Sequence, residues 1–247
     1  MKTLALASML ALTLAAGQQA AAAPAFDVVI KNGHIVDGTG SPWYSGDVAV
    51  RGGRVAAIGK IDASRAKKVI DAKGMVVAPG FIDMLGQSEI SILVDPHLPS
   101  KIYQGITTEI TGEGNSVAPL TDELLQRDAA AWAHYGVRPD WKSFTEYFAR
   151  LERQGMGINL ASYVGATQVR RIVVGEADRK ATAAEMARME ELVRDAMRQG
   201  AVGLSSALQY PPAPYASTDE LIGLARAASQ YGGVYATHMR NEGSAVL

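Results

Sequence analysis

Cysteine is absent from this chain of 247 residues, so disulfide bonds and thiolate metal ligands are excluded. Long runs of like charge are absent as well, and the formal net charge is −1. This balance gives no reason to expect nucleic acid or another polyanion as a partner. The length allows one or two domains, and a hydrophobic content of 48% suits a soluble globular protein. Any metal ion must be bound by histidine, carboxylate, modified lysine or water.

The N-terminus has the pattern of a targeting segment. Lys2 supplies a positive charge, Leu4–Ala16 form an apolar run, and Ala20–Ala23 offer small residues for cleavage. The apolar run is too short to span a bilayer comfortably. We predict a signal peptide over residues 1–23 and an exported, periplasmic mature protein that does not associate with the membrane. A buried or anchoring N-terminal helix is the alternative.

Residues 24–78 have the pattern of a small β-sandwich-like domain of about four to six strands. Short apolar runs alternate there with turn residues. Asn32-Gly33 and Gly52-Gly53 are hairpin-turn signals, and Lys73-Gly74 turns a further strand.

From residue 79 the pattern changes to alternating strands and helices, which is typical of an α/β protein with a parallel sheet. Apolar, β-branched runs predict strands at Phe81–Asp83, Ile106–Thr111, Ile158–Val164, Ala201–Ser206 and Val234–His238. Helices are predicted at Glu123–Ala133, at Phe144–Arg153, from Thr182 to about Gly200, and from Ser217 to about Tyr231. Three of these helices begin with a capping-box pattern: Ser143 with Glu146, Thr182 with Glu185, and Ser217 with Glu220.

The five β/α units predict part of a (β/α)8 TIM-type barrel, which needs eight units. Residues 79–247 are therefore expected to form an incomplete barrel domain, with about three strands and their helices missing. An open, doubly wound parallel sheet that is complete as written is the alternative.

Active residues of such barrels lie at the carboxyl ends of the strands. His238 ends the fifth strand among polar residues, where a neutral imidazole can bind a metal; a hydrogen-bonded structural histidine is the alternative. Glu113 follows the second strand between two glycines, and its carboxylate could bind zinc. A solvated loop glutamate is the alternative for this residue.

Four segments resemble a known family. PGFID, Pro79–Asp83, resembles the first barrel strand of the amidohydrolase superfamily. Gly105–Pro119, Gly200–Pro212 and Tyr235–Gly243 are similar to segments of the N-acyl-D-amino-acid deacylases (D-aminoacylases) within it. The resemblance runs from about Phe26 to the end of the chain, and the segments THMR and SSALQYPP are fairly specific when they occur together.

The resemblance implies roles for three residues, and a fourth candidate lies beside them. His238 matches a zinc-ligand position, and Glu113 stands where the family has a cysteine ligand. Tyr210 matches a tyrosine that contacts the substrate carboxylate, with an aromatic residue that packs on a loop as the alternative. Arg240 is a weaker candidate for the same carboxylate, with a salt bridge to Glu242 as the alternative.

The chain also departs from the family pattern. Leu85 and Gln87 occupy the positions of two first-strand histidines, and Ala166 replaces a third-strand histidine. The next zinc histidine and the catalytic aspartate would lie beyond Leu247, so the general base is not identified within this sequence. We therefore expect one divalent ion, Zn²⁺ or another metal, rather than two.

These observations favour a metal-dependent hydrolase that cleaves the amide bond of small N-acyl-D-amino acids. Two alternatives stay open at this point. One is a truncated or non-catalytic remnant that only binds a ligand, and the other is a hydrolase of cyclic amides or dipeptides. The sequence leaves the oligomeric state open.

Overall fold

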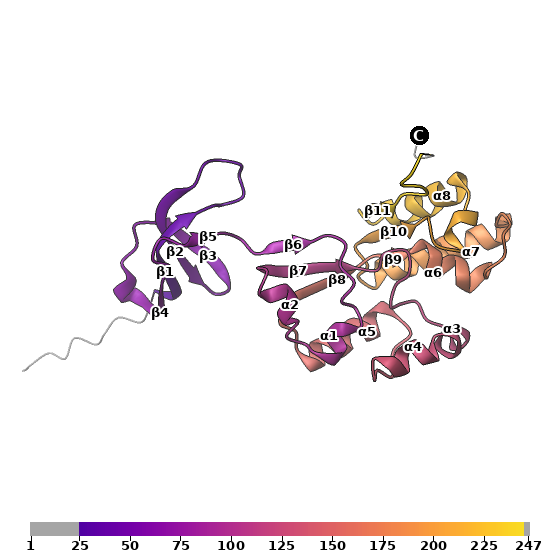
Figure 1. The fold of residues 1–247 in the computed structure, drawn as a ribbon, viewed down its shortest axis with the longest axis horizontal. Helices are drawn as coiled ribbons and strands as arrows, with labels where there is room; N and C mark the ends of the chain where they lie inside the picture. Colours follow the sequence, from indigo (N-terminus) through magenta and orange to yellow (C-terminus); the bar gives the residue numbers. More distant parts are fainter. Residues whose placement is uncertain (1–24, 245–247) are drawn as a thin grey trace, which may run out of the picture. The chain divides into compact units, whose positions relative to one another are not determined.

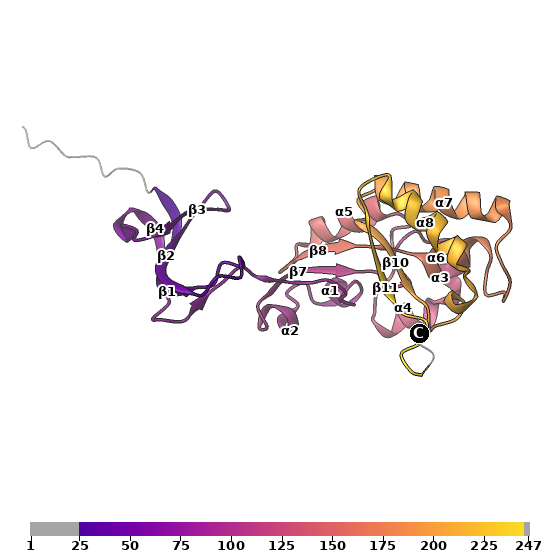
Figure 2. The same ribbon diagram turned by 90° about the horizontal axis from the view of Figure 1, so that it is seen from above.

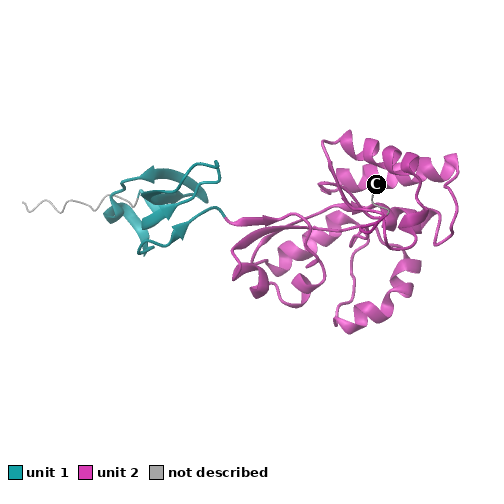
Figure 3. Cartoon of the chain, turned by 45° about the horizontal axis from the view of Figure 1, so that its top comes forward, with its two compact units in different colours: residues 1–79 teal, residues 80–247 magenta. Residues whose placement is uncertain are grey.

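The computed structural model describes residues 25–244, so the predicted signal peptide lies outside the described residues. By internal contacts the chain divides into two compact units, residues 1–79 and residues 80–247 (Figure 3). Among the described residues, no helix has both the length and the apolar character needed to cross a bilayer.

The N-terminal unit contains a single mixed β-sheet. Its strands are β1 (Phe26–Ile35), β2 (Tyr44–Arg51), β3 (Arg54–Gly59), β4 (Ala66–Asp71) and β5 (Val76–Val77), with a 3-10 turn, η1, at Ala63–Arg65. The order is β3-β2-β1-β4, and β5 also pairs with β1. The β2 and β3 pairings are antiparallel, whereas β4 and β5 run parallel to β1. We expected a sandwich-like arrangement, but the described residues of this unit form one sheet rather than two packed sheets.

The two predicted hairpin turns have different outcomes. Gly52-Gly53 does connect β2 to β3, and both glycines have positive φ, as the turns that suit a hairpin require. The prediction for Asn32-Gly33 is wrong, because these residues form a bulge inside β1. Asn32 adopts a φ of 55°, and its N–H donates to Asp47 Oδ1 at 2.9 Å instead of closing a turn.

The C-terminal unit contains two three-stranded parallel sheets (Figure 1). One consists of β6 (Phe81–Asp83), β7 (Ile106–Thr111) and β8 (Asn159–Ser162), and the other of β9 (Val164–Gly165), β10 (Gly203–Ala207) and β11 (Val234–His238). β8 and β9 are the two halves of the predicted third strand, which is interrupted at Tyr163. Val202 N–H donates to Ser162 O at 3.0 Å, so the strands are neighbours in chain order throughout.

Helices cover these strands. They are α1 (Ser91–Val94), α2 (Pro99–Ile102), α3 (Asp122–Arg127), α4 (Ala129–His134), α5 (Phe144–Gln154), α6 (Ala166–Val173), α7 (Ala183–Arg198) and α8 (Thr218–Ser229), with a 3-10 turn, η2, at Ala213–Tyr215. The helix predicted at Glu123–Ala133 is divided into α3 and α4. α7 and α8 lie beside one another over the strands β9 to β11 (Figures 1 and 2).

Local capping explains where the long helices begin. The capping boxes of α5, Ser143 with Glu146, and of α7, Thr182 with Glu185, are both formed. Both helices contribute side chains to one apolar cluster, whose fully buried members include Met189, Val193 and Leu204. Burial of each such side chain contributes about 1.5–3 kcal/mol, so this cluster is a main source of stability for the C-terminal unit.

α8 departs from the predicted capping box. Ser217 accepts the N–H of Glu220 at 3.2 Å, but the Glu220 carboxylate pairs with Arg170 of α6 at 2.7 Å. Both side chains are almost completely buried, at 1% and 3% exposed. Arg170 also donates to the carbonyl oxygens of Ala177 and Arg179. This ion pair joins α6 to α8 inside the protein.

Glu220→Gln is expected to destabilise the fold by about 3–5 kcal/mol, because it leaves the Arg170 charge buried without a counter-charge. The measurement is the free energy of unfolding in urea. Asp195→Asn is the matched control, since it removes an exposed pair with Arg198 and should cost less than about 1 kcal/mol. Equal losses in the two variants would contradict the role given to the buried pair.

Candidate functional site

The loop that carries Glu113 is hydrogen-bonded to Ser205 of β10. Ser205 Oγ accepts the N–H of Gly114 at 2.9 Å and donates to the carbonyl oxygen of Gly112. Both glycines have positive φ, and a Cβ at Gly112 would lie 2.5 Å from the Tyr163 carbonyl oxygen. Residues with side chains would be strained at both positions, and Gly112 allows the backbone to approach the break between β8 and β9 closely.

His238 ends β11, the strand next to β10, and it pairs in register with Ala207. A Cβ at Gly114 would lie 2.7 Å from Cβ of the same Ala207. The structure therefore brings the Glu113 loop to the strand end beside His238. The Nδ1 atom of His238 lies 3.0 Å from Glu242 Oε1. A hydrogen on Nδ1 would donate to this carboxylate and leave Nε2 free to bind a metal, as in many zinc sites.

Tyr210 lies in the loop after β10 and comes close to His238. The two rings meet edge to face with centroids 5.5 Å apart, and Tyr210 is 56% exposed. Leu208 N–H donates to His238 O at 3.1 Å, which ties this loop to the end of β11. The exposed phenol can donate a hydrogen bond to a ligand carboxylate.

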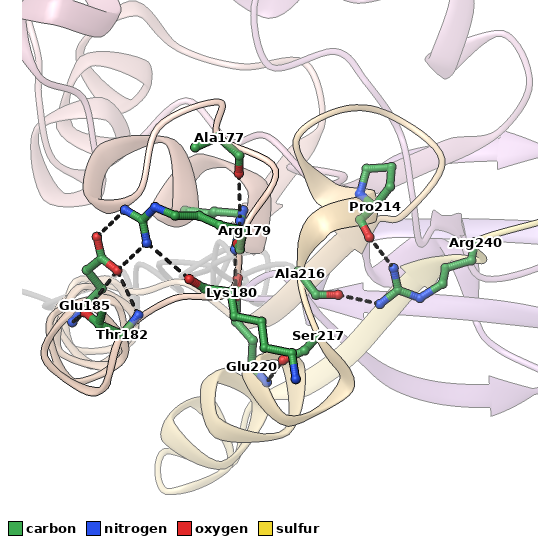
Figure 4. Close-up of polar contacts among 11 residues, drawn as sticks. Ala177, Arg179, Lys180, Thr182, Glu185, Pro214, Ala216, Ser217, Glu220 and Arg240 are labelled. Atoms are coloured by element: carbon green, nitrogen blue, oxygen red, sulfur yellow. Dashed lines mark hydrogen bonds and ion pairs between the residues drawn. The ribbon is translucent and has the colours of Figure 1, made fainter.

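Arg240 is engaged with the backbone of the loop around η2. Its guanidinium donates to the carbonyl oxygens of Pro214 at 2.9 Å and Ala216 at 2.6 Å (Figure 4). The alternative salt bridge to Glu242 is not formed, because Glu242 pairs with His238 instead. Binding of a substrate carboxylate by Arg240 stays a prediction.

Neither of the two first-strand positions, Leu85 and Gln87, carries a histidine, but Gln87 contacts the candidate ligand Glu113. Gln87 Nε2 donates to Glu113 Oε2 at 3.1 Å. Leu85 is apolar and has no donor atom. Asp83, which ends β6, forms an ion pair with Lys101 at 2.7 Å, and Lys101 also lies 3.4 Å from Glu109.

The described residues fit only part of a metal site. No group of three or more histidine, aspartate or glutamate side chains among residues 25–244 could hold one ion together. A catalytic zinc ion needs three protein ligands and a water molecule. Glu113 and His238 supply a carboxylate and an imidazole, which is a suitable donor pair, so a third ligand must come from outside the described residues. The side chains of Leu85, Gln87 and Ala166 do not fit a binuclear site, because histidines are missing from these three positions.

Two buried carboxyl groups lie close to this site. Glu109 is completely buried, accepts the N–H of Ser88 at 3.0 Å, and has one oxygen without a partner. Glu89 also has a buried oxygen without a partner. Burial raises the pKa of Glu89 to about 7, and the nearby charges of Glu109 and Glu113 add to the effect. Glu89 is therefore largely protonated at slightly acidic pH.

Because the pKa of Glu89 is raised, we expect the protein to lose stability as the pH rises. This pKa is higher in the folded state than the ordinary 4.5, so the folded protein binds the proton more tightly. The free energy of unfolding should fall between about pH 5 and pH 7 by about 3 kcal/mol at most. Glu89→Gln keeps the shape and should remove most of this slope. The measurement is urea unfolding at several pH values, and an unchanged slope in the variant would contradict the assignment.

A pocket of about 230 Å³ lies beside the Glu113 loop. Its walls include Glu89, Asn115, Trp132 and two residues of α6, Gln168 and Arg171. The sequence pattern did not predict the helix α6, which contributes Gln168 and Arg171 to this pocket. The only local signal was the position of this segment after the third strand, because Gly165 provides no side-chain cap to mark the start of α6.

Comparison with known proteins gives a consistent result. The model of the amidohydrolase family matches residues 68–245. The chain is 41% identical over 221 residues to the N-acyl-D-glutamate deacylase of Alcaligenes xylosoxydans xylosoxydans, covering 89% of this chain and 45% of that protein. It is 37% identical over 230 residues to the D-aminoacylase of the same organism, covering 90% and 46%. The chain thus spans about half the length of the curated relatives it matches.

Solved structures agree with the sequence similarity. The crystal structure of a D-aminoacylase, described as defining a novel subset of amidohydrolases, matches with a TM-score of 0.79 and 39% identity over 89% of this chain and 46% of that chain. The N-acyl-D-glutamate deacylase of Bordetella bronchiseptica, complexed with zinc and a phosphonate inhibitor, matches with a TM-score of 0.79 and 37% identity over 90% and 46%. An L-hydantoinase of Arthrobacter aurescens, at 22% identity and a TM-score of 0.55, shares the fold.

The family model matches most of the chain, and the sequence and structure similarities point the same way. The chain therefore belongs to the amidohydrolase family and is similar, within it, to the D-aminoacylases.

Proposed function

We propose that the protein is a metal-dependent hydrolase that removes the acyl group from N-acyl-D-amino acids. The observation that carries the proposal is the approach of the Glu113 loop to the strand end that bears His238. The relatives named above act on N-acyl-D-glutamate and related compounds, which are small molecules with an amide next to a carboxylate.

The finer description of the fold is part of this proposal. Residues 80–247 would be the first five units of a (β/α)8 barrel, preceded by a small β domain. The support is the order of the strands, which are parallel neighbours in chain order from β6 to β11, together with the TM-score of 0.79 to the D-aminoacylase.

Each candidate residue has a definite task in the proposed reaction. The Glu113 carboxylate and the His238 imidazole would bind the metal, with Glu242 orienting the imidazole ring through Nδ1. A bound divalent ion would polarise the amide carbonyl and lower the pKa of a water molecule. Tyr210 would donate to the free carboxylate of the substrate, with Arg240 as a weaker second contact. The general base would come from outside the described residues.

A single ion is expected because the two first-strand positions lack the histidines that would bind a second one. Gln87 directs an amide hydrogen at Glu113, where it satisfies a carboxylate lone pair without adding charge. One structural study of D-aminoacylase describes a binuclear centre with activation by one metal and attenuation by the second. We propose that this protein keeps the first of these functions and lacks the second.

The full-length protein is expected to bind about one divalent ion, and Glu113→Ala or His238→Ala should each weaken binding more than about 100-fold, since loss of even an outer partner costs 10–100-fold. The measurement is metal content after dialysis, followed by calorimetric titration with Zn²⁺. Glu152→Ala and His97→Ala are matched controls on exposed residues and should bind normally. A metal-free protein that still binds an N-acyl-D-amino acid would point to the non-catalytic remnant.

Restoring the family's first-strand histidines should create a second site. The double variant Leu85→His/Gln87→His is expected to bind about two Zn²⁺ ions, because imidazoles would replace an apolar and an amide side chain. Activity should then fall with excess Zn²⁺ more steeply than in the unmodified protein. Leu85→Met/Gln87→Asn is the control, which should keep one ion. A stoichiometry of two ions in the unmodified protein would refute the single-ion proposal.

A further inference from the structure

Arg171 makes contacts that the proposed reaction does not use. It lies on α6, and its side chain is only 17% exposed. Nε donates to Glu176 Oε1 at 2.8 Å, and one terminal nitrogen donates to the side-chain oxygen of Asn115. The other terminal nitrogen donates to the carbonyl oxygen of Pro211 at 3.0 Å. One guanidinium thus contacts two loops that are far apart in the sequence.

Both loops carry candidate site residues. Asn115 lies two positions after Glu113, and Pro211 directly follows Tyr210. The first loop contains the proposed metal ligand, and the second contains the proposed anchor for the substrate carboxylate. Among the described residues, Arg171 is the one side chain that hydrogen-bonds to both Asn115 and Pro211.

The start of α6 is already packed against the first loop. Gln168 N–H donates to Gly114 O at 3.2 Å, and a Cβ at Gly165 would lie 2.1 Å from the same oxygen. Gly165 therefore permits a contact that any larger residue would block. Arg171 lies about one helical turn further along α6 and extends this contact to the second loop.

We propose that Arg171 is a positioning residue, which holds the Glu113 loop and the Tyr210 loop at a constant separation. This inference rests on the proposed function for its consequence in catalysis. In an N-acyl-amino acid the amide nitrogen and the carboxylate are attached to the same carbon, so the reacting carbonyl and the carboxylate have a short, nearly constant spacing. An enzyme that anchors the carboxylate and attacks the amide needs two loops whose spacing matches it.

The guanidinium group suits this task because it is planar and presents its N–H donors in a rigid fork. Lysine has a compact ammonium group on a shorter, flexible stem, which does not reproduce the separation and direction of the two terminal guanidinium nitrogens. Arg171→Lys should therefore retain the Glu176 ion pair without restoring the link between the loops. Arg171→Met keeps much of the apolar stem and removes every polar contact.

Arg127 supplies a matched control. It lines the same pocket and also pairs with Glu176, with Nη1 at 3.3 Å, but its other hydrogen bonds go to Asp128. Arg127→Met removes a comparable charge from the same network and touches neither of the two loops. Thermal unfolding of all variants reports any general loss of stability.

The first experiment is hydrogen exchange of the full chain, read by mass spectrometry. In Arg171→Met and Arg171→Lys, exchange should rise about tenfold or more in the segments 112–117 and 208–216, because hydrogen bonds to a charged group are lost there. Arg127→Met should leave both segments unchanged. The inference is overturned if Arg171→Met leaves both segments protected, or if Arg127→Met exposes them equally.

The second experiment is kinetic and uses an N-acetyl-D-amino acid as the probe. Arg171→Met should raise KM about tenfold or more with a smaller change in kcat and an unchanged metal content. A fall in kcat alone, or loss of the metal, would overturn the positioning role. If the unmodified protein hydrolyses no N-acyl-D-amino acid, the proposed function fails, and the exchange experiment still decides whether Arg171 joins the loops.

Discussion

The site depends on one hydroxyl group, that of Ser205 on β10. It accepts a hydrogen bond from Gly114 and donates one to Gly112, so it holds both residues that flank Glu113. Ser205 is completely buried, and water cannot compete for these bonds. Because β10 also pairs with β11, the same strand places His238 beside the Glu113 loop. A carboxylate and an imidazole that are 125 residues apart in sequence are thereby brought to one edge of the sheets.

Charge around the site is unbalanced in favour of carboxylates. Burial raises the pKa of Glu89 to about 7, and the nearby charges of Glu109 and Glu113 add a smaller effect in the same direction. Lys101 offsets part of this charge through its contacts with Asp83 and Glu109. A cation bound at Glu113 would reduce the repulsion further, which is a physical reason for the site to favour a divalent ion.

Much of the fold could be predicted because local rules dominate it. The capping boxes at Ser143 and Thr182 depend on residues three positions apart, and both helices begin where those pairs predict. Local rules failed where tertiary contacts compete. Glu220 pairs with Arg170 rather than completing a capping box, and Asn32-Gly33 forms a bulge because β1 continues through it.

The site was partly predictable for a similar reason. Strand ends in a parallel sheet converge, so Glu113 and His238 could be singled out from the pattern and the family resemblance together. The contacts of Gln87 and Arg171 could not be predicted, because each depends on the meeting of distant segments. α6, which carries Arg171, has no capping side chain and contains β-branched residues such as Ile172, so its helical pattern was weak.

The central claim is that Glu113 and His238 bind the same single ion. Crystals of the full-length protein grown with Zn²⁺ would test it by anomalous diffraction at the zinc absorption edge. The account predicts one peak, within about 2.0–2.2 Å of a Glu113 carboxylate oxygen and of His238 Nε2. A peak bound to other residues, or two peaks bridged by Glu113, would contradict it.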